Sequence, residues 1–323
     1  CANGYCYGAQ KSRVPAFSQV AEQVVRMSLV FLIAGKWAAE GTEITVRLAV
    51  YGHLIGEIGA ASFNLLCLGL FPPQGRNMER AEESSCLMPL MTLALPLMGN
   101  RLILNLLAGA EAVWIPNRLQ MSGLSDAEAF SVYGILTGMA LPFILFPSAI
   151  TNSMAVLLLP TVAEAQADGN EARISSMISM SLRYSCYMGV LCIGIFTIFG
   201  NQLGVSVFHD QNAGTYITIL SWLCPFMYLA TTMGSILNGL GRTSSTFFQN
   251  VFAMVIRLAF VLFAIPRYGI LGYLWGMLVS ELALALMSFL AVKRLVPFCW
   301  DTVNMIVKPV LLLLISIGMY LAF

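Results

Sequence analysis

Long apolar runs separated by short polar connections dominate the pattern of hydrophobic and polar positions along the chain. Nine such runs have roughly the 20 residues that a helix needs to cross a bilayer. They cover residues 17–35, 47–70, 87–108, 130–159, 174–200, 216–237, 247–266, 270–292 and 303–323. The run at 130–159 is long for one helix, but two spans would each be too short, which favours a single tilted and kinked helix. We therefore predict an all-α, polytopic membrane protein with about nine transmembrane helices.

Residues 87–160 contain the two apolar runs that carry the most unusual residues for a membrane-spanning helix. Both apolar runs in this region contain prolines, and the first run also contains Arg101 near its middle; the prolines are Pro89, Pro96, Pro142 and Pro147. A carbonyl group freed by a proline, or a charge near the middle of the bilayer, costs several kcal/mol in hydrocarbon unless protein or water forms hydrogen bonds with it. We therefore expect these two helices to line a cavity.

The composition supports a membrane protein and argues against several other classes. Hydrophobic residues make up 58% of the chain and charged residues 10%, with a mean hydropathy of +0.79, whereas soluble domains carry about 25% charged residues. The net charge of +1 gives no reason to expect nucleic acid as a partner. The eight cysteines lie apart without a CxxC pair, as expected for packing residues. The sequence contains no convincing nucleophile, phosphate-binding or metal-ligand motif, so we predict no enzyme activity, no catalytic residues, no cofactor and no metal.

Lysine and arginine are distributed unequally between alternate connections. One set collects Lys11, Arg13, Arg76, Arg80, Arg173, Arg242, Lys293, Arg294 and Lys308, and the other has only Lys36, Arg118 and Arg267. Cytoplasmic loops of membrane proteins carry the excess of cations. We therefore predict that residues 74–86 and 166–173 are cytoplasmic and that residues 202–214 are external.

An internal repeat relates the start of the chain to its last third. The segment GAQKSRVPAFSQVAEQVVRMSLVFLIAG aligns with GLGRTSSTFFQNVFAMVIRLAFVLFAIP, and the helices that follow align after a change in loop length. Two charged residues in consecutive helices recur, Arg26 as Arg257 and Glu57 as Glu281. Chance alignment of apolar helices rarely reproduces charges in this way, so we interpret the match as a true repeat. Gly52 is matched by Gly276 in the same alignment.

The repeat predicts a domain organisation. The even number of spans between the copies gives them the same orientation, as in transporters built from parallel repeats. Residues 87–292 then form one complete six-helix lobe, and residues 1–71 are the last two helices of an N-terminal lobe. Residues 72–86 form a cytoplasmic linker, and residues 293–323 add a C-terminal transmembrane helix. On this interpretation the chain is a fragment without about four N-terminal helices.

Three stretches carry a resemblance to a known family. They are GYCYGAQKSRVPAFSQVAEQVVR, the pair IPNRLQMSG and YGILTGMALPFILFPSAITNSMAVLLLPTVAEA, and ILNGLGRTSSTFFQN. They resemble the polysaccharide-biosynthesis flippases of the stage V sporulation protein B type. Those are relatives of the MurJ lipid II flippase in the superfamily that also contains the multidrug and toxic compound extrusion (MATE) antiporters.

This resemblance implies two pseudo-symmetric six-helix lobes around a cavity that opens alternately to each side of the bacterial cytoplasmic membrane. The implied function is the flipping of a lipid-linked oligosaccharide or cell-wall precursor, with roles in peptidoglycan synthesis or sporulation. The implied partners are that lipid-linked saccharide, membrane lipids and a coupling ion, Na⁺ or H⁺. Two alternatives stay open: a cation- or proton-coupled multidrug antiporter, which predicts an acidic cavity, and a membrane scaffold without transport activity.

The repeated charges lie near the centres of their spans, where a lone charge is costly and a partner on the next helix is the cheapest relief. We predict Arg26–Glu57 and Arg257–Glu281 contacts, with Glu22, one turn from Arg26, as a competing partner. A structural role in fixing helix register is favoured over a substrate role. His53, one turn before Glu57, is interpreted as an ion-coupling partner or as a simple polar contact.

Arg101 is the residue predicted to bind substrate. The nearest acids, Glu111, Asp126 and Glu128, are placed in an external connection, so that a water-filled cavity is needed to keep this guanidinium charged. Its planar fork suits a diphosphate, whereas a lysine offers only a point charge. The alternative is that it bonds to carbonyl groups freed by the prolines. The neutral residues expected to bind the saccharide beside it are Asn100, Asn105, Asn152 and Ser153.

Overall fold

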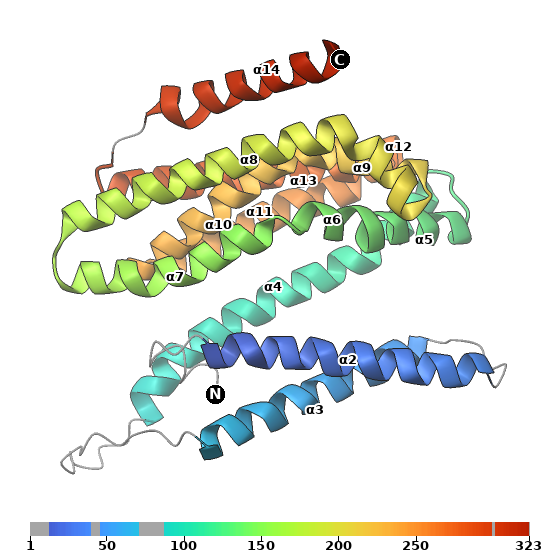
Figure 1. Cartoon of the computed structure of the whole chain (residues 1–323), viewed down its shortest axis with the longest axis horizontal. Coiled ribbons are helices and arrows are strands. Elements are labelled where there is room, and N and C mark those ends of the chain that lie inside the picture. Colours follow the sequence, from blue (N-terminus) through green and yellow to red (C-terminus); the bar gives the residue numbers. More distant parts are fainter. Residues whose placement is uncertain (1–12, 40–45, 71–86, 299–300, 323) are drawn as a thin grey trace. The chain divides into compact units, whose positions relative to one another are not determined.

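The structure is a computed structural model that describes residues 13–39, 46–70, 87–298 and 301–322 (Figure 1). These residues are almost entirely helical and contain no strand. The chain divides into two compact units, Cys1–Cys86 and Leu87–Phe323. Residues 74–86, predicted to be a cytoplasmic connection, lie outside the described residues.

The first unit is an antiparallel pair of helices, α2 (Arg13–Ala39) and α3 (Val46–Leu70) (Figure 1). The face of α3 that contacts α2 is made of small buried residues at a helical spacing, Gly52, Gly56 and Ala60. A Cβ atom at Gly52 would overlap the side chain of Val30. Glycine therefore sets the close approach of the two helices.

The second unit is a bundle of long and short helices. Its elements are α4 (Leu87–Met121), α5 (Asp126–Ile135), the π-helical turn η1 (Leu136–Ala140), α6 (Leu141–Leu145), α7 (Ser148–Ala167), α8 (Glu171–Phe208), α9 (Gln211–Leu220), the 3₁₀ turn η2 (Ser221–Leu223), α10 (Cys224–Gly239), α11 (Thr243–Phe263), α12 (Ile265–Tyr268), α13 (Ile270–Leu295), the π-helical turn η3 (Val303–Val307) and α14 (Lys308–Ala322).

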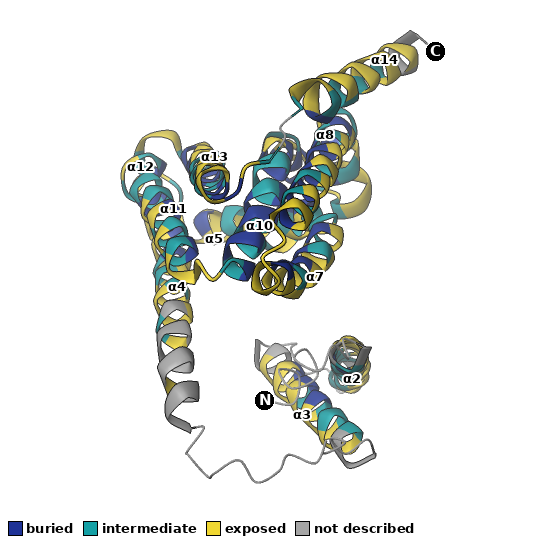
Figure 2. Cartoon of the chain, turned by 90° about the vertical axis from the view of Figure 1, so that its left-hand side faces the viewer, coloured by how far each residue is buried: buried dark blue, intermediate teal, exposed yellow. Residues whose placement is uncertain are grey.

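The continuous segment α9–α10 lies at the centre of this bundle. Half of the residues in its most apolar 18-residue stretch are buried, against 22–33% in the other long apolar helices of the second unit. α10 packs on α7, α8 and α13, and Figure 2 shows it as a largely buried helix between them. Tyr228 and Met233 of α10 are fully buried in two hydrophobic clusters that together follow the length of the bundle.

The predicted span at 130–159 is a broken but continuous crossing. α5 passes into the π-helical turn η1, Pro142 lies in the first turn of α6, and a turn at Phe146 and Pro147 separates α6 from α7. Proline has no N–H group and interrupts the helical hydrogen-bond ladder. In Figure 1 these segments follow one another in one direction before α8 returns. The prolines therefore produce the kink that the sequence predicted.

Within the part of the chain that the structure describes, seven segments are long and apolar enough to cross a membrane: Ala16–Trp37, Asp126–Leu145, Ser148–Ala167, Glu171–Phe208, Gln211–Gly239, Thr243–Phe263 and Ile270–Leu295. The predicted all-α, polytopic class is confirmed. The count is lower than the predicted nine because α3, α4 and the shorter apolar helix Val303–Met319 are not among the seven, whereas the kinked crossing is counted as two segments.

The connections of the second unit gather at two ends of the bundle (Figure 1). At one end α7 joins α8, α10 joins α11 and α13 terminates, and this end carries Arg173, Arg242, Lys293 and Arg294. At the other end α4 joins α5, α8 joins α9 and α11 joins α13, and this end carries Arg118 and Arg267. We call the first end the basic end.

Candidate functional site: a polar cavity between α4, α11 and α13

The polar face of α4 is the starting point of the site. Arg101, Asn105, Ala108 and Glu111 follow one another at intervals of four, three and three residues, which places them on one side of a helix. Arg101 and Asn105 are exposed, whereas Glu111 is only 5% exposed. The helix therefore leads from an exposed cation near its middle to a buried carboxylate two to three turns further on.

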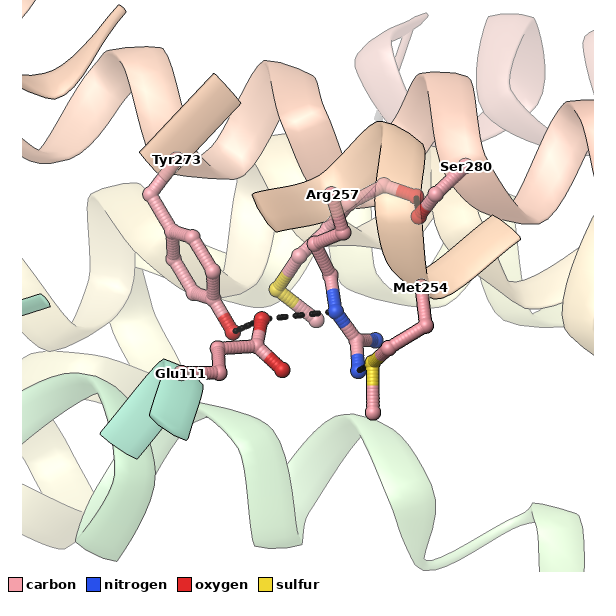
Figure 3. A network of polar contacts seen from close by, with 6 residues as sticks. Glu111, Met254, Arg257, Tyr273 and Ser280 are labelled. Carbon is pink, nitrogen blue, oxygen red and sulfur yellow. Dashed lines mark hydrogen bonds and ion pairs between the residues drawn. The ribbon is translucent and has the colours of Figure 1, made fainter. Parts of the chain in front are cut away.

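The buried end of this face is an ion-pair network between three helices. Oε1 of Glu111 lies 2.6 Å from Nε of Arg257 on α11, and the hydroxyl of Tyr273 on α13 donates a hydrogen bond of 3.0 Å to the same oxygen (Figure 3). The Nε–H group does not point at Oε1 with hydrogen-bond geometry, so the contact is an ion pair. Nη2 of Arg257 contacts Sδ of Met254 at 2.9 Å.

This network joins α4 and α13 to α11 through opposite charges that are largely shielded from solvent. The side chains of Arg257 and Glu111 are 21% and 7% exposed. Removing one partner of such a pair leaves the other as an uncompensated charge, which typically costs about 3–5 kcal/mol. The three helices are thus held in register by Glu111, Arg257 and Tyr273.

A cavity of about 280 Å³ opens beside the network. Its polar lining comes from Asn105 of α4, Asn250 and Arg257 of α11, and Ser280 and Glu281 of α13. Figure 3 shows Ser280 on the helix that also carries Tyr273, beyond Arg257. Asn105 is the one predicted substrate-binding residue among these. Arg101 lies one helical turn before Asn105 on the same face.

The predicted Arg257–Glu281 contact is not formed. Arg257 instead pairs with Glu111, and no nitrogen of Arg257 lies within 4.0 Å of a carboxylate oxygen of Glu281, although both side chains line the cavity. The physical reason is that α4 continues to Met121, so Glu111 is a buried helix residue and not part of an external connection as expected. Asp126 and Glu128 begin the next helix, α5, where Glu128 and Ser125 form a capping box.

The predicted Arg26–Glu57 contact is also absent. Nη2 of Arg26 lies 3.0 Å from Oε1 of Glu22, the competing partner, and Nη1 lies 3.1 Å from Nδ1 of His53. A guanidinium group only donates hydrogen bonds, so Nδ1 of His53 must accept, and the neutral ring carries its proton on Nε2. Glu57 is exposed because it lies one residue away from the glycine face that contacts α2.

The other predicted substrate-binding residues lie apart from the cavity lining. Asn152 and Ser153 are exposed on α7, where Oγ of Ser153 donates to the carbonyl of Ala149 within the same helix. α7 packs mainly on α8 and α10, whereas α4 packs on α5, α11 and α12. Arg101 makes no hydrogen bond or ion pair with any residue that the structure describes. The side chain of Asn100 lies outside the described residues.

Sequence reasoning missed Glu111 and Tyr273. The predicted span ends at residue 108, with Glu111 in an external connection, whereas α4 continues to Met121. The available signal was the spacing of Arg101, Asn105 and Glu111 on one helical face. Among the residues that the structure describes, no group of three or more His, Cys, Asp or Glu side chains could hold a metal ion.

Comparison with known proteins finds relatives of two kinds. The chain is 23% identical over 302 residues to stage V sporulation protein B of Bacillus subtilis (strain 168), covering 91% of this chain and 58% of that protein. It is 21% identical over 280 residues to sporulation protein YkvU of the same organism, covering 85% and 63%. A match of 27% over 173 residues, 49% of this chain and 37% of the relative, is to the probable multidrug resistance protein YoeA. No protein-family model matches the chain.

The fold is that of a solved MATE transporter. The bent form of Vibrio cholerae VcmN superposes with a TM-score of 0.65 at 14% identity, covering 91% of this chain and 64% of that one. A structure of a VcmN point mutant gives a TM-score of 0.68 at 15% identity, covering 91% and 65%. The chain thus spans about three fifths of the length of the first two curated relatives. These likenesses agree with the resemblance to stage V sporulation protein B-type proteins and their MATE relatives that the sequence motifs indicated.

Proposed function

We propose that this chain belongs to a transporter that flips a lipid-linked oligosaccharide or cell-wall precursor across the bacterial cytoplasmic membrane by alternating access. Residues 87–292 would be one six-helix lobe of that transporter, and residues 1–71 part of the other. A coupling ion, Na⁺ or H⁺, belongs to the same proposal, with Glu281 as the carboxylate that an ion entering the cavity would meet.

The polar face of α4 is the observation that carries the proposal. Arg101 is exposed near the middle of a 35-residue helix in a chain with only 10% charged residues. A cation at that depth is costly in hydrocarbon and is found where protein or water surrounds it. Its guanidinium group can bind a diphosphate with two hydrogen bonds, and Asn105, one turn further on, offers neutral hydrogen bonds to a sugar. The likeness to stage V sporulation protein B over 91% of the chain supports the same class.

A multidrug antiporter is the second candidate. The similarity to YoeA and the VcmN fold support it, and so do the acids near the cavity, Glu111 and Glu281. Arg257 neutralises only Glu111, however, so Glu281 is the one carboxylate of the cavity lining that would be left to meet a cationic drug. This candidate predicts export of lipophilic cations that depends on Glu281 and is indifferent to Arg101.

The two functions are separated by reconstituting the protein in liposomes and following two substrates. One assay measures how much fluorescent lipid-linked disaccharide becomes accessible to a membrane-impermeant reagent, and the other measures movement of ethidium. Arg101→Ala should lower disaccharide flipping about tenfold or more, the effect of losing a charge-assisted hydrogen bond worth about 1.5–3 kcal/mol.

Arg101→Lys should restore little of that flipping, because a lysine cannot bind a diphosphate with two parallel hydrogen bonds. The matched control is Arg118→Ala, which removes an arginine from the last turn of the same helix and should leave flipping unchanged. Normal flipping in Arg101→Ala would contradict the role of Arg101. Ethidium movement without disaccharide flipping in the unaltered protein would favour the antiporter.

A further inference from the structure

A long apolar groove lies between the α9–α10 segment and α13. It consists of two adjoining hollows of about 480 and 420 Å³, which share Phe226 of α10 and Leu282 of α13. Each volume falls within the range of about 300–1,000 Å³ that is usual for small-molecule sites. Because the two hollows share lining residues, we treat them as one site, the α10–α13 groove.

The two ends of the groove differ in chemistry. Trp222 and Trp275 line one end and are 55% and 60% exposed, so this end is open. Lys293, an exposed residue, lines the other end together with Ile306 of η3. Between them the lining is apolar apart from Thr218. The Lys293 end belongs to the basic end of the bundle, beside the exposed Arg294.

The length of the groove matches the thickness of a bilayer. Trp275 and Lys293 are 18 residues apart on the continuous helix α13, which at 1.5 Å per residue is about 27 Å. The hydrocarbon core of a bilayer is about 30 Å thick. Tryptophan favours the interface between hydrocarbon and headgroups, and lysine extends its ammonium group to the same region. The groove therefore runs through the hydrocarbon core with an interfacial residue at each end.

We propose that the α10–α13 groove is a binding site for an anionic phospholipid, with a hydrocarbon chain along Leu282 and Phe226 and the headgroup phosphate at Lys293. The apolar lining has no polar group that would orient a sugar or a peptide backbone in the middle of the groove. Lys293 at one end provides charge complementarity to a phosphate. This site is separate from the polar cavity on the other side of α13, and it does not depend on the proposed transport activity.

Selectivity for the headgroup distinguishes such a site from ordinary contact with lipid. A zwitterionic phospholipid offers the same hydrocarbon chain but no net charge to Lys293. A basic residue near the membrane surface contributes about 1 kcal/mol toward anionic lipids, which is about a fivefold preference. The preference should therefore depend on Lys293, whereas entry of the chain should depend on the space beside Leu282.

Tryptophan fluorescence offers a direct test if the reporter lies in the half of the groove that the bound chain fills, and Leu286, which is exposed and lines the Lys293 end, is such a position. The whole chain, carrying Leu286→Trp and phenylalanine in place of its native tryptophans (Trp37, Trp114, Trp222, Trp275 and Trp300), is placed in bilayers and titrated with phospholipid brominated on its acyl chains, which quenches tryptophan on contact. Brominated phosphatidylglycerol should quench at about a fivefold lower mole fraction than brominated phosphatidylcholine.

Lys293→Gln should remove this difference, and the matched control Arg267→Gln, a change of an exposed cation at the opposite end, should keep it. Ala285→Phe, which fills the groove next to Leu282, should reduce quenching by both lipids, and Leu290→Phe on an exposed part of α13 outside the groove should not. The circular dichroism of each variant establishes that it is folded.

Equal quenching by the two lipids in the parent protein would overturn the proposal, as would a preference that survives Lys293→Gln. A tryptophan at position 286 that is shielded from both lipids would show that protein covers the groove, and this too would overturn the proposal. Native mass spectrometry of the unaltered chain provides a second measurement that needs no substitution. Phosphatidylglycerol should stay bound through delipidation more often than phosphatidylcholine, and equal retention would count against the site.

Discussion

Arg257 and Arg101 show two ways in which an arginine is accommodated in an apolar chain. Arg257 is paired with Glu111 and lies beside Tyr273 and Met254, so its charge is met by protein. Arg101 is exposed on α4 and has no such partner among the described residues. The first arrangement is typical of a structural pair and the second of a residue that meets water or a ligand. This difference is the reason for assigning substrate binding to Arg101.

The structural role of Arg257 leads to a prediction about stability. Arg257→Met should lower the free energy of unfolding by about 3–5 kcal/mol, because Glu111 is left as a buried, uncompensated charge. Adding Glu111→Gln in the same chain should recover much of that loss. The measurement is equilibrium unfolding in detergent, read as a double-mutant cycle.

An exposed ion pair of the same molecule provides the control. Arg173 and Glu164 lie 3.8 Å apart, with side chains 45% and 56% exposed, and a surface pair contributes about 0–1 kcal/mol. Arg173→Met should therefore change stability by less than about 1 kcal/mol. A similar loss for Arg257→Met and Arg173→Met would show that the Glu111–Arg257 pair is not effectively buried.

Pairing at the level of single residues was only partly predictable from the sequence. The sequence identified Arg26 and Arg257 as intramembrane charges that need partners, and it named Glu22 as a competitor for Arg26. It did not predict Glu111, because choosing among several carboxylates requires knowing which helix faces pack together. Helical periodicity places a residue on a face, but the neighbour of that face is decided by tertiary packing.

At the scale of elements, helices and their breaks could be predicted well because they depend on local chemistry. All nine apolar runs correspond to helical segments, and Pro142 and Pro147 lie where the crossing at 130–159 is broken. The end of α4 was missed by more than three turns, since Glu111 and Pro116 are unusual inside a helix. Pro116 is buried, and packing overrides its low helix propensity there.

The repeat predicts equivalent helix contacts in the two units, and the glycines make this testable. A Cβ atom at Gly276 would lie 2.5 Å from Cβ of Phe260, which is closer than carbon atoms can approach. Gly276→Ala should push α13 away from α11 and cost about 1–3 kcal/mol. Gly52→Ala, at the matching position of the first unit, should weaken the α2–α3 contact in the same way because its Cβ would overlap Val30.

Gly318 of α14 is the matched control, because a Cβ atom there meets no other atom within 4 Å. Gly318→Ala should be neutral or stabilise α14 by up to about 1 kcal/mol through its higher helix propensity. Thermal unfolding of the three variants in the same detergent measures the difference. Equal melting temperatures for Gly276→Ala and the parent chain would contradict the close packing of α11 and α13.

At the scale of the whole molecule, the sequence pattern and the fold agree on which connections lie together. Four of the five cations predicted to be cytoplasmic in the second unit, Arg173, Arg242, Lys293 and Arg294, gather at one end of the bundle, and the fifth, Lys308, begins α14. This agreement is expected because each crossing reverses the direction of the chain, so successive connections lie at alternate ends of the bundle. The identity of the two sides depends instead on how the chain is inserted into the membrane, and it is predicted by the excess of cations.

Side-specific labelling tests that orientation. Asp168→Cys lies in the connection between α7 and α8 at the basic end, and Asn212→Cys lies at the start of α9 at the opposite end; both positions are exposed. In intact cells a membrane-impermeant maleimide should label Asn212→Cys, whereas Asp168→Cys should react only after the cells are opened. The parent chain, which carries the native cysteines, is the control for background labelling. Labelling of Asp168→Cys from outside would reverse the orientation, and Lys293, with the headgroup end of the α10–α13 groove, would then face the external leaflet.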